Sequence, residues 1–314
     1  MDDEGYIGPV GCGAVSFEKN DTVKKAFSES VERRSLLFGA KSNELQMSAA
    51  FDLINKKIKY VPTIYTKYRE EEPIIDTTGT AVHTRGDIAI FNALTELLEK
   101  NSVFLLWYGR LAYILEVEHS SLYYKKKIQE SIKVKFFLQN FFSPLNVVIC
   151  MFEDTKSPIR YKFGIGSDLN LDVAIDKAIS EAFFLGQYHD IKNFYENNNN
   201  SNFVRVDSHL DDYIEELKKL PLYKSCTIVE PNQQDYNEKL NSIIKNLPKW
   251  IENLFVFVLK QKIHNNLSAV KIISKDLMLH VPIKEYMNLN LNINKNTILL
   301  TEEKLRAIPD CPII

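Results

Sequence analysis

Apolar residues recur at helical intervals in several stretches of the chain, separated by short polar or glycine-containing segments. The first stretch covers residues 21–37, with Asp21 or Thr22 as the expected N-cap and Gly39 as the expected stop. Further helices are predicted over residues 87–128, 171–186, 211–217 and 236–247. The helix at 87–128 is long, and we expect an internal break near Asn101 or His119.

Strands are predicted where β-branched and aromatic residues alternate or form short apolar runs. These runs cover residues 59–68, 146–152, 160–165, 254–259 and 269–273, and the small polar residues 77–84 lead from a strand into the second helix. The elements follow no regular strand–helix–strand rhythm. The pattern therefore favours an α+β fold, with mixed sheets and flanking helices in a single large domain.

Composition narrows the class of protein. The chain has 314 residues with 39 basic and 41 acidic side chains, so neither nucleic acid nor an anionic membrane is expected as a partner. The longest apolar run, residues 103–115, is interrupted by Arg110 and is too short to span a bilayer. Four dispersed cysteines without a CxxC pair, and an acidic N-terminus without a signal peptide, favour a cytoplasmic protein with free thiols.

Common motifs for nucleotides, metals and nucleophiles are absent from the sequence, which has no P-loop, no HExxH helix and no GxSxG elbow. The six histidines form no set with ligand spacing. Two GxG sequences, at residues 11–13 and 164–166, do not extend to GxGxxG and are better explained by tight turns. The Asn-rich stretch at residues 196–202 is expected to be an exposed, mobile loop.

Glutamates stand out on the predicted helices. Glu29 and Glu32 lie one turn apart on the first helix, Glu96 and Glu99 on the second, and Glu181 stands alone on the third. Two carboxylates one turn apart repel each other weakly on a solvated face and strongly when they are partly buried. Two such helices facing each other would form a four-carboxylate box that suits Mg²⁺ carrying nucleotide phosphates. The alternative is an ordinary solvated helix face.

The glutamates lie in segments that resemble the YcaO-domain family. Residues 26–38 resemble the family's first ExxER helix, and residues 77–109 resemble a segment in which small residues precede a second ExxE helix. Residues 164–183 resemble a third segment that carries another glutamate, and residues 146–154 and 254–273 resemble strands between and after these blocks. The resemblance runs from about residue 11 to the C-terminus. It implies one YcaO-like, ATP-dependent catalytic domain over residues 1–314.

The resemblance implies an ATP- and Mg²⁺-dependent enzyme that activates a peptide amide. The carboxylates that it assigns to Mg²⁺ around ATP are Glu29, Glu32, Glu96, Glu99 and Glu181. It assigns Arg33 to the family's basic residue after the first ExxE motif, as a residue that contacts ATP.

The chain departs from the family pattern at four positions. Lys25 stands in place of a serine, Thr84 in place of an asparagine, and Phe184 in place of a glutamine. The acidic residue expected ahead of the second helix falls on Ile88, with Asp87 beside it. We retain Lys25, Thr84 and Asp87 as candidate ATP-binding residues.

The tail, residues 305–314, resembles the proline-containing tail that reaches the active site in cyclodehydratase members of the family. By this resemblance Pro312 and Ile314 are candidate catalytic residues, with the terminal carboxylate as the base that takes the substrate proton. A frayed terminus is the alternative.

In the implied reaction a Cys, Ser or Thr side chain of a ribosomal precursor peptide attacks the preceding carbonyl. ATP then phosphorylates the oxygen, and loss of phosphate leaves a thiazoline or oxazoline.

The resemblance also implies partners. The chain length suggests no fused leader-binding domain, so we expect a separate protein that recognises the leader of the precursor peptide. An FMN-dependent azoline dehydrogenase and a homodimer are further candidates. The whole arrangement is most similar to thiazole-forming enzymes of thiopeptide antibiotic biosynthesis. Two alternatives stay open: thioamide or macroamidine formation at the same ATP site, and a non-catalytic scaffold that binds peptide or a partner enzyme.

Overall fold

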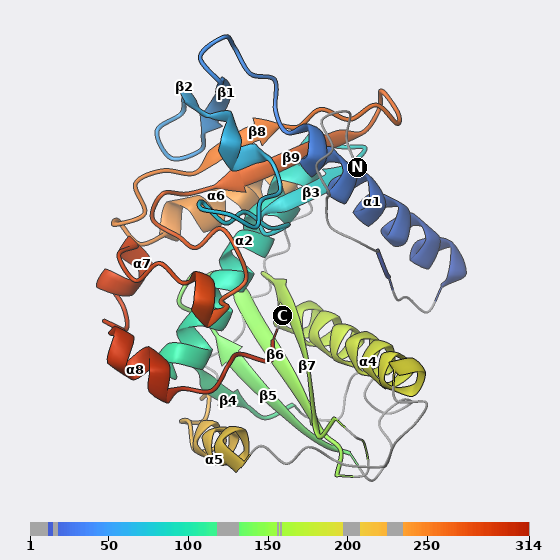
Figure 1. Ribbon diagram of the computed structural model, residues 1–314, viewed down its shortest axis with the longest axis vertical. Helices are drawn as coiled ribbons and strands as arrows, with labels where there is room; N and C mark the ends of the chain where they lie inside the picture. The colour runs from blue at the N-terminus through green and yellow to red at the C-terminus, as the bar shows by residue number, and fades with distance from the viewer. Residues whose placement is uncertain are drawn as a thin grey trace. The chain divides into compact units, whose positions relative to one another are not determined.

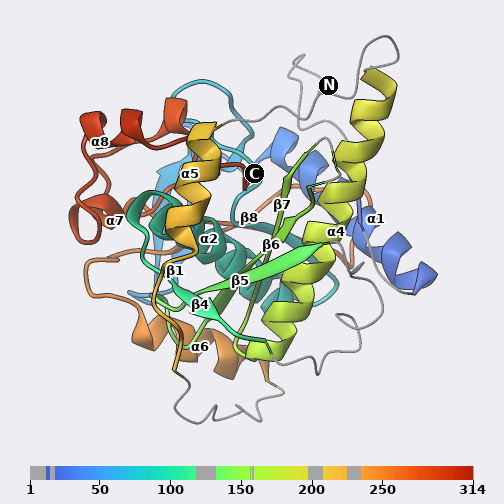
Figure 2. The same ribbon diagram turned by 90° about the horizontal axis from the view of Figure 1, so that it is seen from below.

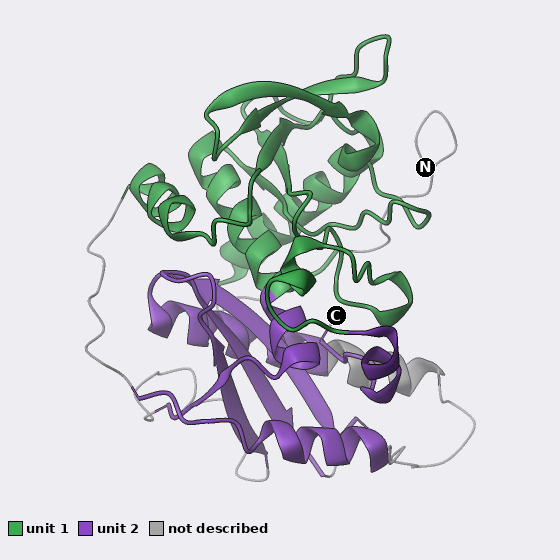
Figure 3. Ribbon diagram, turned by 90° about the vertical axis from the view of Figure 1, so that its left-hand side faces the viewer, with its two compact units in different colours: residues 1–101, 233–300 green, residues 102–232, 301–314 purple. Residues whose placement is uncertain are grey.

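The computed structural model describes residues 12–14, 18–117, 132–155, 157, 159–196, 208–224 and 235–313. The chain forms two compact units (Figure 3). Unit 1 contains residues 1–101 and 233–300, and unit 2 contains residues 102–232 and 301–314. Each unit has one antiparallel sheet accompanied by helices, which confirms the predicted α+β fold class.

Unit 1 is built on a five-stranded sheet in the order β2-β1-β8-β9-β3 (Figure 1). Its strands are β1 (Met47–Asp52), β2 (Lys57–Pro62), β3 (Thr80–His83), β8 (Phe255–Val258) and β9 (Ser268–Ile273). Helix α1 (Lys19–Phe38) packs against this sheet through one buried stripe that includes Val31 and Leu36. Because apolar side chains of α1, β8 and β9 meet in that core, the sheet fixes the position of α1.

Helix α1 begins two residues earlier than predicted. Its N-cap is Glu18, so the expectation of Asp21 or Thr22 as the cap is wrong: both lie inside the first turn, where they add little as caps. The predicted stop is correct. Gly39 has φ 62° and donates its N–H to the Ser35 carbonyl at 2.9 Å.

Helix α2 (Gly86–Gly109) begins in unit 1 and ends in unit 2. The predicted continuation to residue 128 is wrong, because Arg110 takes φ 52° and the chain enters β4 (Tyr113–Leu115). Asn101 does not break the helix. Its buried amide donates to the carbonyls of Leu97 and Met278 at 2.8 and 3.0 Å, and it is therefore compatible with a continuous helix. The other predicted break, His119, lies outside the described residues.

Unit 2 is built on a four-stranded sheet in the order β4-β5-β6-β7. Its further strands are β5 (Lys133–Gln139), β6 (Asn146–Glu153) and β7 (Tyr161–Asp168), and α4 (Leu171–Glu196) runs along them (Figure 2). The predicted tight turn at residues 164–166 is wrong. Gly164 and Gly166 lie inside β7, where an added Cβ would come within 2.0 Å of Ala182 N and 2.2 Å of Ala174 O of α4. These glycines allow the helix backbone to approach the strand.

Several shorter elements complete the fold. The predicted strand at 59–68 ends at Pro62, and a short 3-10 helix (Thr63–Thr66) follows it. The predicted end of the third helix at residue 186 is also early, since α4 continues to Glu196. The remaining elements are α5 (Ser208–Leu217), α6 (Tyr236–Asn246), α7 (Asn292–Lys295), α8 (Glu302–Ala307) and a 3-10 turn (Lys284–Tyr286).

Two further sequence expectations concern the bilayer and the thiols. Across the described ranges, none of the helices combines the length and apolarity needed to cross a bilayer. Cys12, Cys150 and Cys311 are free thiols, while Cys226 lies outside the described residues. Most of the Asn-rich stretch, residues 197–202, also lies outside them.

Candidate active site

Unit 1 brings the two predicted glutamate pairs within range of each other's charge. Glu32 of α1 interacts electrostatically with Glu96 of α2 and with Glu29 on its own helix, and Glu96 interacts with Glu99. All four side chains are half-buried. The packing of unit 1 therefore covers part of each of these four side chains, so the glutamate pairs do not lie on fully solvated helix faces.

Two of these carboxyl groups have strongly perturbed ionisation. Burial raises the pKa of Glu32 well above its usual range; Glu96 and Glu29 raise it further, while Lys271 and Arg33 oppose the rise. Burial also raises the pKa of Glu96 to about 8, with Lys100 and Lys271 opposing the rise and Glu99 and Asp76 adding to it. Carboxyls that share a site in this way favour a proton or a bound cation.

Glu29 has two defined partners. Its Oε2 accepts the Gly13 N–H at 2.8 Å, and its Oε1 pairs with an Arg33 guanidinium nitrogen at 2.7 Å, one turn further along α1. This i,i+4 pair orients both side chains on one face of the helix. A guanidinium in that position can also recognise phosphate oxygens.

Glu96 is held by the segment that precedes α2. Its Oε2 accepts the Thr80 N–H at 3.2 Å. The small residues around Gly79 make this contact possible. Gly79 has φ 74°, and a Cβ there would lie 2.5 Å from the Ile272 carbonyl, so the backbone passes β9 too closely for a larger residue.

A buried lysine, Lys271 of β9, lies beside this segment and was not predicted. Its ammonium donates to the carbonyls of Asp76 and Thr78 at 2.9 and 2.8 Å and contacts the Thr80 hydroxyl at 3.2 Å. Burial lowers the pKa of Lys271, and the charges of Asp76, Glu96 and Glu32 oppose that effect. The only sequence signal was one lysine within an apolar strand, AVKII.

The other predicted residues have different surroundings. Glu99 pairs with Lys100 at 3.9 Å. Glu181 belongs to unit 2, where its Oε2 accepts the Ile165 N–H of β7 at 2.7 Å. Lys25 and Thr84 are exposed.

Asp87 forms an ion pair with Arg85 at the start of α2, with Arg85 Nε 3.1 Å from Oδ1. This pair lowers the pKa of Asp87 from its ordinary value, the Arg85 hydrogen bond being the main cause. Asp87 is therefore an ionised residue with a partner of its own.

The C-terminal tail is packed within unit 2. The Pro309 carbonyl accepts a hydrogen bond from the Trp107 indole at 3.0 Å, and both Cys311 and Ile313 are buried. Residues 309–313 therefore contradict the alternative of a frayed terminus. Pro312 is exposed between the two buried residues, and Ile314 lies outside the described residues.

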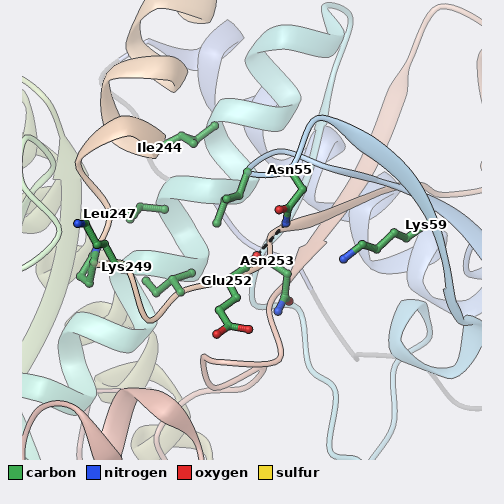
Figure 4. Close-up of a pocket in the computed structure, with 10 residues that line it drawn as sticks. Asn55, Lys59, Ile244, Leu247, Lys249, Glu252 and Asn253 are labelled. Carbon is green, nitrogen blue, oxygen red and sulfur yellow. Dashed lines mark hydrogen bonds between the residues drawn. The ribbon is translucent and has the colours of Figure 1, made fainter.

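A pocket of about 570 Å³ lies in unit 1 between the β1–β2 connection and the segment that follows α6 (Figure 4). Asn55 and Glu252 meet on its wall, with the Asn55 amide 2.9 Å from the Glu252 carbonyl. None of the predicted ATP or metal residues lines this pocket. It is therefore separate from the candidate site.

The donor chemistry of unit 1 fits Mg²⁺ and ATP. Carboxylate oxygens are the ligands Mg²⁺ prefers, and a cation would offset the burial and the repulsion that raise the pKa values of Glu32 and Glu96. Within the described part of the chain, no group of three or more Asp, Glu, His or Cys side chains forms a ready metal cage. Mg²⁺ is commonly held by one or two carboxylates together with waters and substrate phosphates, so no such cage is required.

The sequence comparison identifies the family. The model of the YcaO family, described as YcaO cyclodehydratase, ATP- and Mg²⁺-binding, matches residues 19–277. The chain therefore belongs to the YcaO family. This membership confirms the predicted enzyme class, ATP-dependent cyclodehydratase, and the predicted cofactors, ATP and Mg²⁺. No curated protein sequence matches the chain significantly.

Solved structures share the fold at low sequence identity. YcaO from Methanopyrus kandleri bound with AMPPCP and Mg²⁺ has a TM-score of 0.69 at 14% identity, covering 85% of this chain and 79% of that chain. The E. coli microcin synthetase McbBCD complex with pro-MccB17 bound has a TM-score of 0.68 at 18% identity, covering 96% and 90%. The heterocyclase TruD has a TM-score of 0.59 at 17% identity and covers 95% of this chain, but 44% of its own length.

Proposed function

We propose that this protein activates backbone amides of a ribosomal precursor peptide by phosphorylation and so converts Cys, or Ser and Thr, to thiazoline or oxazoline. The observation that carries the proposal is the glutamate cluster of α1 and α2, in which burial and mutual repulsion raise the pKa values of Glu32 and Glu96. A bound cation stabilises such a cluster, and an enzyme that uses ATP binds Mg²⁺ together with the nucleotide phosphates.

In this proposal the residues of the chain have separate tasks. Glu29, Glu32, Glu96 and Glu99 of unit 1 hold Mg²⁺ with ATP. Arg33, already oriented by Glu29 at 2.7 Å, contacts phosphate oxygens. Bound Mg²⁺ and ATP supply the phosphoryl group and neutralise its charge, which makes an amide oxygen a workable leaving group. Lys25, Thr84 and Asp87 complete the ATP contacts.

The tail supplies the proton acceptor in this scheme. Trp107 holds Pro309, and Cys311 and Ile313 are buried, so the tail is packed as far as residue 313. The terminal carboxylate of Ile314 takes the proton from the attacking side chain. Deleting Ile314 alone leaves Ile313 in place and should lower peptide modification while leaving nucleotide binding unchanged.

Peptide delivery is assigned to a separate partner. The E. coli microcin synthetase is a complex with its precursor bound, which supports a multi-protein arrangement for this chain. The partner recognises the leader of the precursor, and an FMN-dependent azoline dehydrogenase acts afterwards, as in thiopeptide-type biosynthesis. A second copy of the chain is a further candidate partner.

The test combines the protein, its precursor peptide, the leader-binding partner, ATP and Mg²⁺, and measures peptide mass. We expect the loss of one water for each modified residue. Glu96→Gln should abolish this loss while the circular dichroism spectrum stays unchanged, since one carboxylate of the cation site is gone. Glu238→Gln, the same change at an exposed position of α6 in unit 1, is the matched control and should retain activity. Full activity in Glu96→Gln, or ATP-independent modification, would contradict the proposal.

A further inference from the structure

Lys271 is a charged side chain at the centre of an apolar strand. It lies on β9 between Val270 and Ile272, and all three residues are at most 3% exposed, with Lys271 itself at 0%. Removing an ammonium group from water costs several kcal/mol unless the protein replaces its hydration. A purely structural β9 would have an apolar residue at this position, so the lysine needs another explanation.

The contacts of Lys271 define what it organises. Thr80 is its direct cross-strand partner in the β3–β9 ladder, so the two side chains share one face of the sheet. The ammonium binds the Asp76 and Thr78 carbonyls at 2.9 and 2.8 Å and the Thr80 hydroxyl at 3.2 Å. All three acceptors are neutral and lie within residues 76–80. The Lys271 ammonium therefore holds residues 76–80 in place through hydrogen bonds to three of their oxygen atoms.

The same segment holds Glu96. The Thr80 N–H donates to Glu96 Oε2 at 3.2 Å, while the Thr80 hydroxyl contacts Lys271. A single residue thus joins the buried ammonium to the carboxylate. Lys271 also interacts electrostatically with the carboxyl groups of Asp76, Glu96 and Glu32. Within the described residues, the hydrogen bonds of the Lys271 ammonium go to carbonyl and hydroxyl oxygens, so this ammonium leaves the carboxylate oxygens available to a cation.

We infer that Lys271 is a positioning residue for the Mg²⁺–ATP site: it fixes residues 76–80 so that the Thr80 N–H orients Glu96, and it balances part of the acidic charge. This inference rests on the proposed role of Glu96 as a cation ligand. Lys271 acts through the 76–80 segment and does not touch the substrate. It is comparable to the outer-shell partners of metal ligands, whose loss commonly weakens metal binding about 10- to 100-fold.

Metal affinity is the direct test. The affinity of Mn²⁺ for the full chain, loaded with a non-hydrolysable ATP analogue, would be measured by electron paramagnetic resonance. Lys271→Met keeps an unbranched side chain one atom shorter than lysine and removes the ammonium group, and we expect about 10- to 100-fold weaker Mn²⁺ binding. Thr80→Val keeps strand propensity and the Thr80 N–H but removes one acceptor, and a smaller loss is expected.

The control is Lys218→Met in unit 2. Lys218 pairs with Glu153 and Glu215 at 2.9 and 2.7 Å, so its loss should lower the melting temperature while Mn²⁺ affinity stays unchanged. This comparison separates a loss of stability from a loss of positioning. Unchanged Mn²⁺ affinity in a folded Lys271→Met protein overturns the inference. If Lys271→Met does not fold, unchanged affinity in Thr80→Val overturns it.

The result that would contradict the proposed function differs from the result that would overturn this inference. Wild-type protein that binds Mn²⁺ with nucleotide but changes no peptide mass would contradict the cyclodehydratase proposal and leave the role of Lys271 intact. Wild-type protein that binds no Mn²⁺ with nucleotide would contradict the cation site and, with it, the inference.

Discussion

The Glu96 carboxyl group should make the free energy of unfolding of the protein depend on pH. Burial raises its pKa from an ordinary value of about 4.5 to about 8. Between these two values the folded protein binds more protons than the unfolded chain, so the free energy of unfolding should fall as pH rises. The slope is at most about 1.4 kcal/mol per pH unit for one group. Thermal unfolding of the metal-free protein from pH 5 to pH 8 would measure it.

Removing the titrating group gives the control for this pH dependence. Glu96→Gln should make the decline between pH 5 and pH 8 shallower and leave the part that comes from Glu32, whereas Glu238→Gln should leave the whole decline unchanged. Cation binding should show the opposite trend, because Mn²⁺ must displace the proton of Glu96, and affinity should rise with pH up to about 8. An equally steep decline in Glu96→Gln would assign the effect to another group.

At the scale of elements, the contact of β7 with α4 depends on glycines. A Cβ on Gly166 would lie 2.2 Å from the Ala174 carbonyl, which belongs to the helix backbone and cannot move aside without shifting α4. Gly166→Ala should therefore lower the free energy of unfolding by about 3 kcal/mol, the upper end for overpacking. Urea denaturation with an unchanged m-value would measure the loss.

Gly186, on α4 itself, is the matched comparison. A Cβ there would meet the flexible Lys162 side chain at 2.7 Å, and alanine also has the higher helix propensity. Gly186→Ala should therefore change stability by no more than about 1 kcal/mol. A similar loss in both variants would show that close backbone approach is not the reason for Gly166.

Helical periodicity predicted α1 and α6, and a continuous apolar run predicted β6, whose residues are nearly all buried. Helices α1 and α6 and strand β6 lie within two residues of their predicted bounds. Strand β1 was missed because its sequence, MSAAFD, has few β-branched residues. Its place in the sheet comes from pairing with β2 and β8, which the sequence of the strand itself does not show. The end of α2 was missed because the helix is apolar on nearly all sides, so its pattern carries no stop signal, although Gly109 stands at the true end.

The candidate site was predictable where spacing along one helix defines it. Glu29 with Glu32, and Glu96 with Glu99, are one turn apart in any helix, so sequence alone indicates which carboxylates can cooperate. Lys271 was not predictable, because its importance comes from β9 lying against residues 76–80, which are almost 200 positions away in the chain. Likewise, the packing of the tail through Pro309 and Trp107 is a tertiary contact.

At the scale of the whole molecule, the family match and the predicted residues extend over both units. The match covers residues 19–277, while Glu29, Glu32, Glu96 and Glu99 belong to unit 1 and Glu181 and the tail belong to unit 2. Helix α2 carries the chain from one unit to the other. Neither unit by itself contains all the predicted residues.

Peptide engagement should control ATP turnover by the whole molecule. Phosphorylation requires the peptide oxygen to lie close to the phosphate, and a misplacement of about 1 Å can cost on the order of 100-fold in rate. The chain with ATP and Mg²⁺ should therefore hydrolyse ATP slowly. Precursor peptide together with the leader-binding partner should raise phosphate release by on the order of 100-fold. Peptide without its leader, in the presence of the same partner, is the control and should give little increase. Rapid hydrolysis by the chain alone, or an equal increase with leaderless peptide, would contradict partner-dependent delivery.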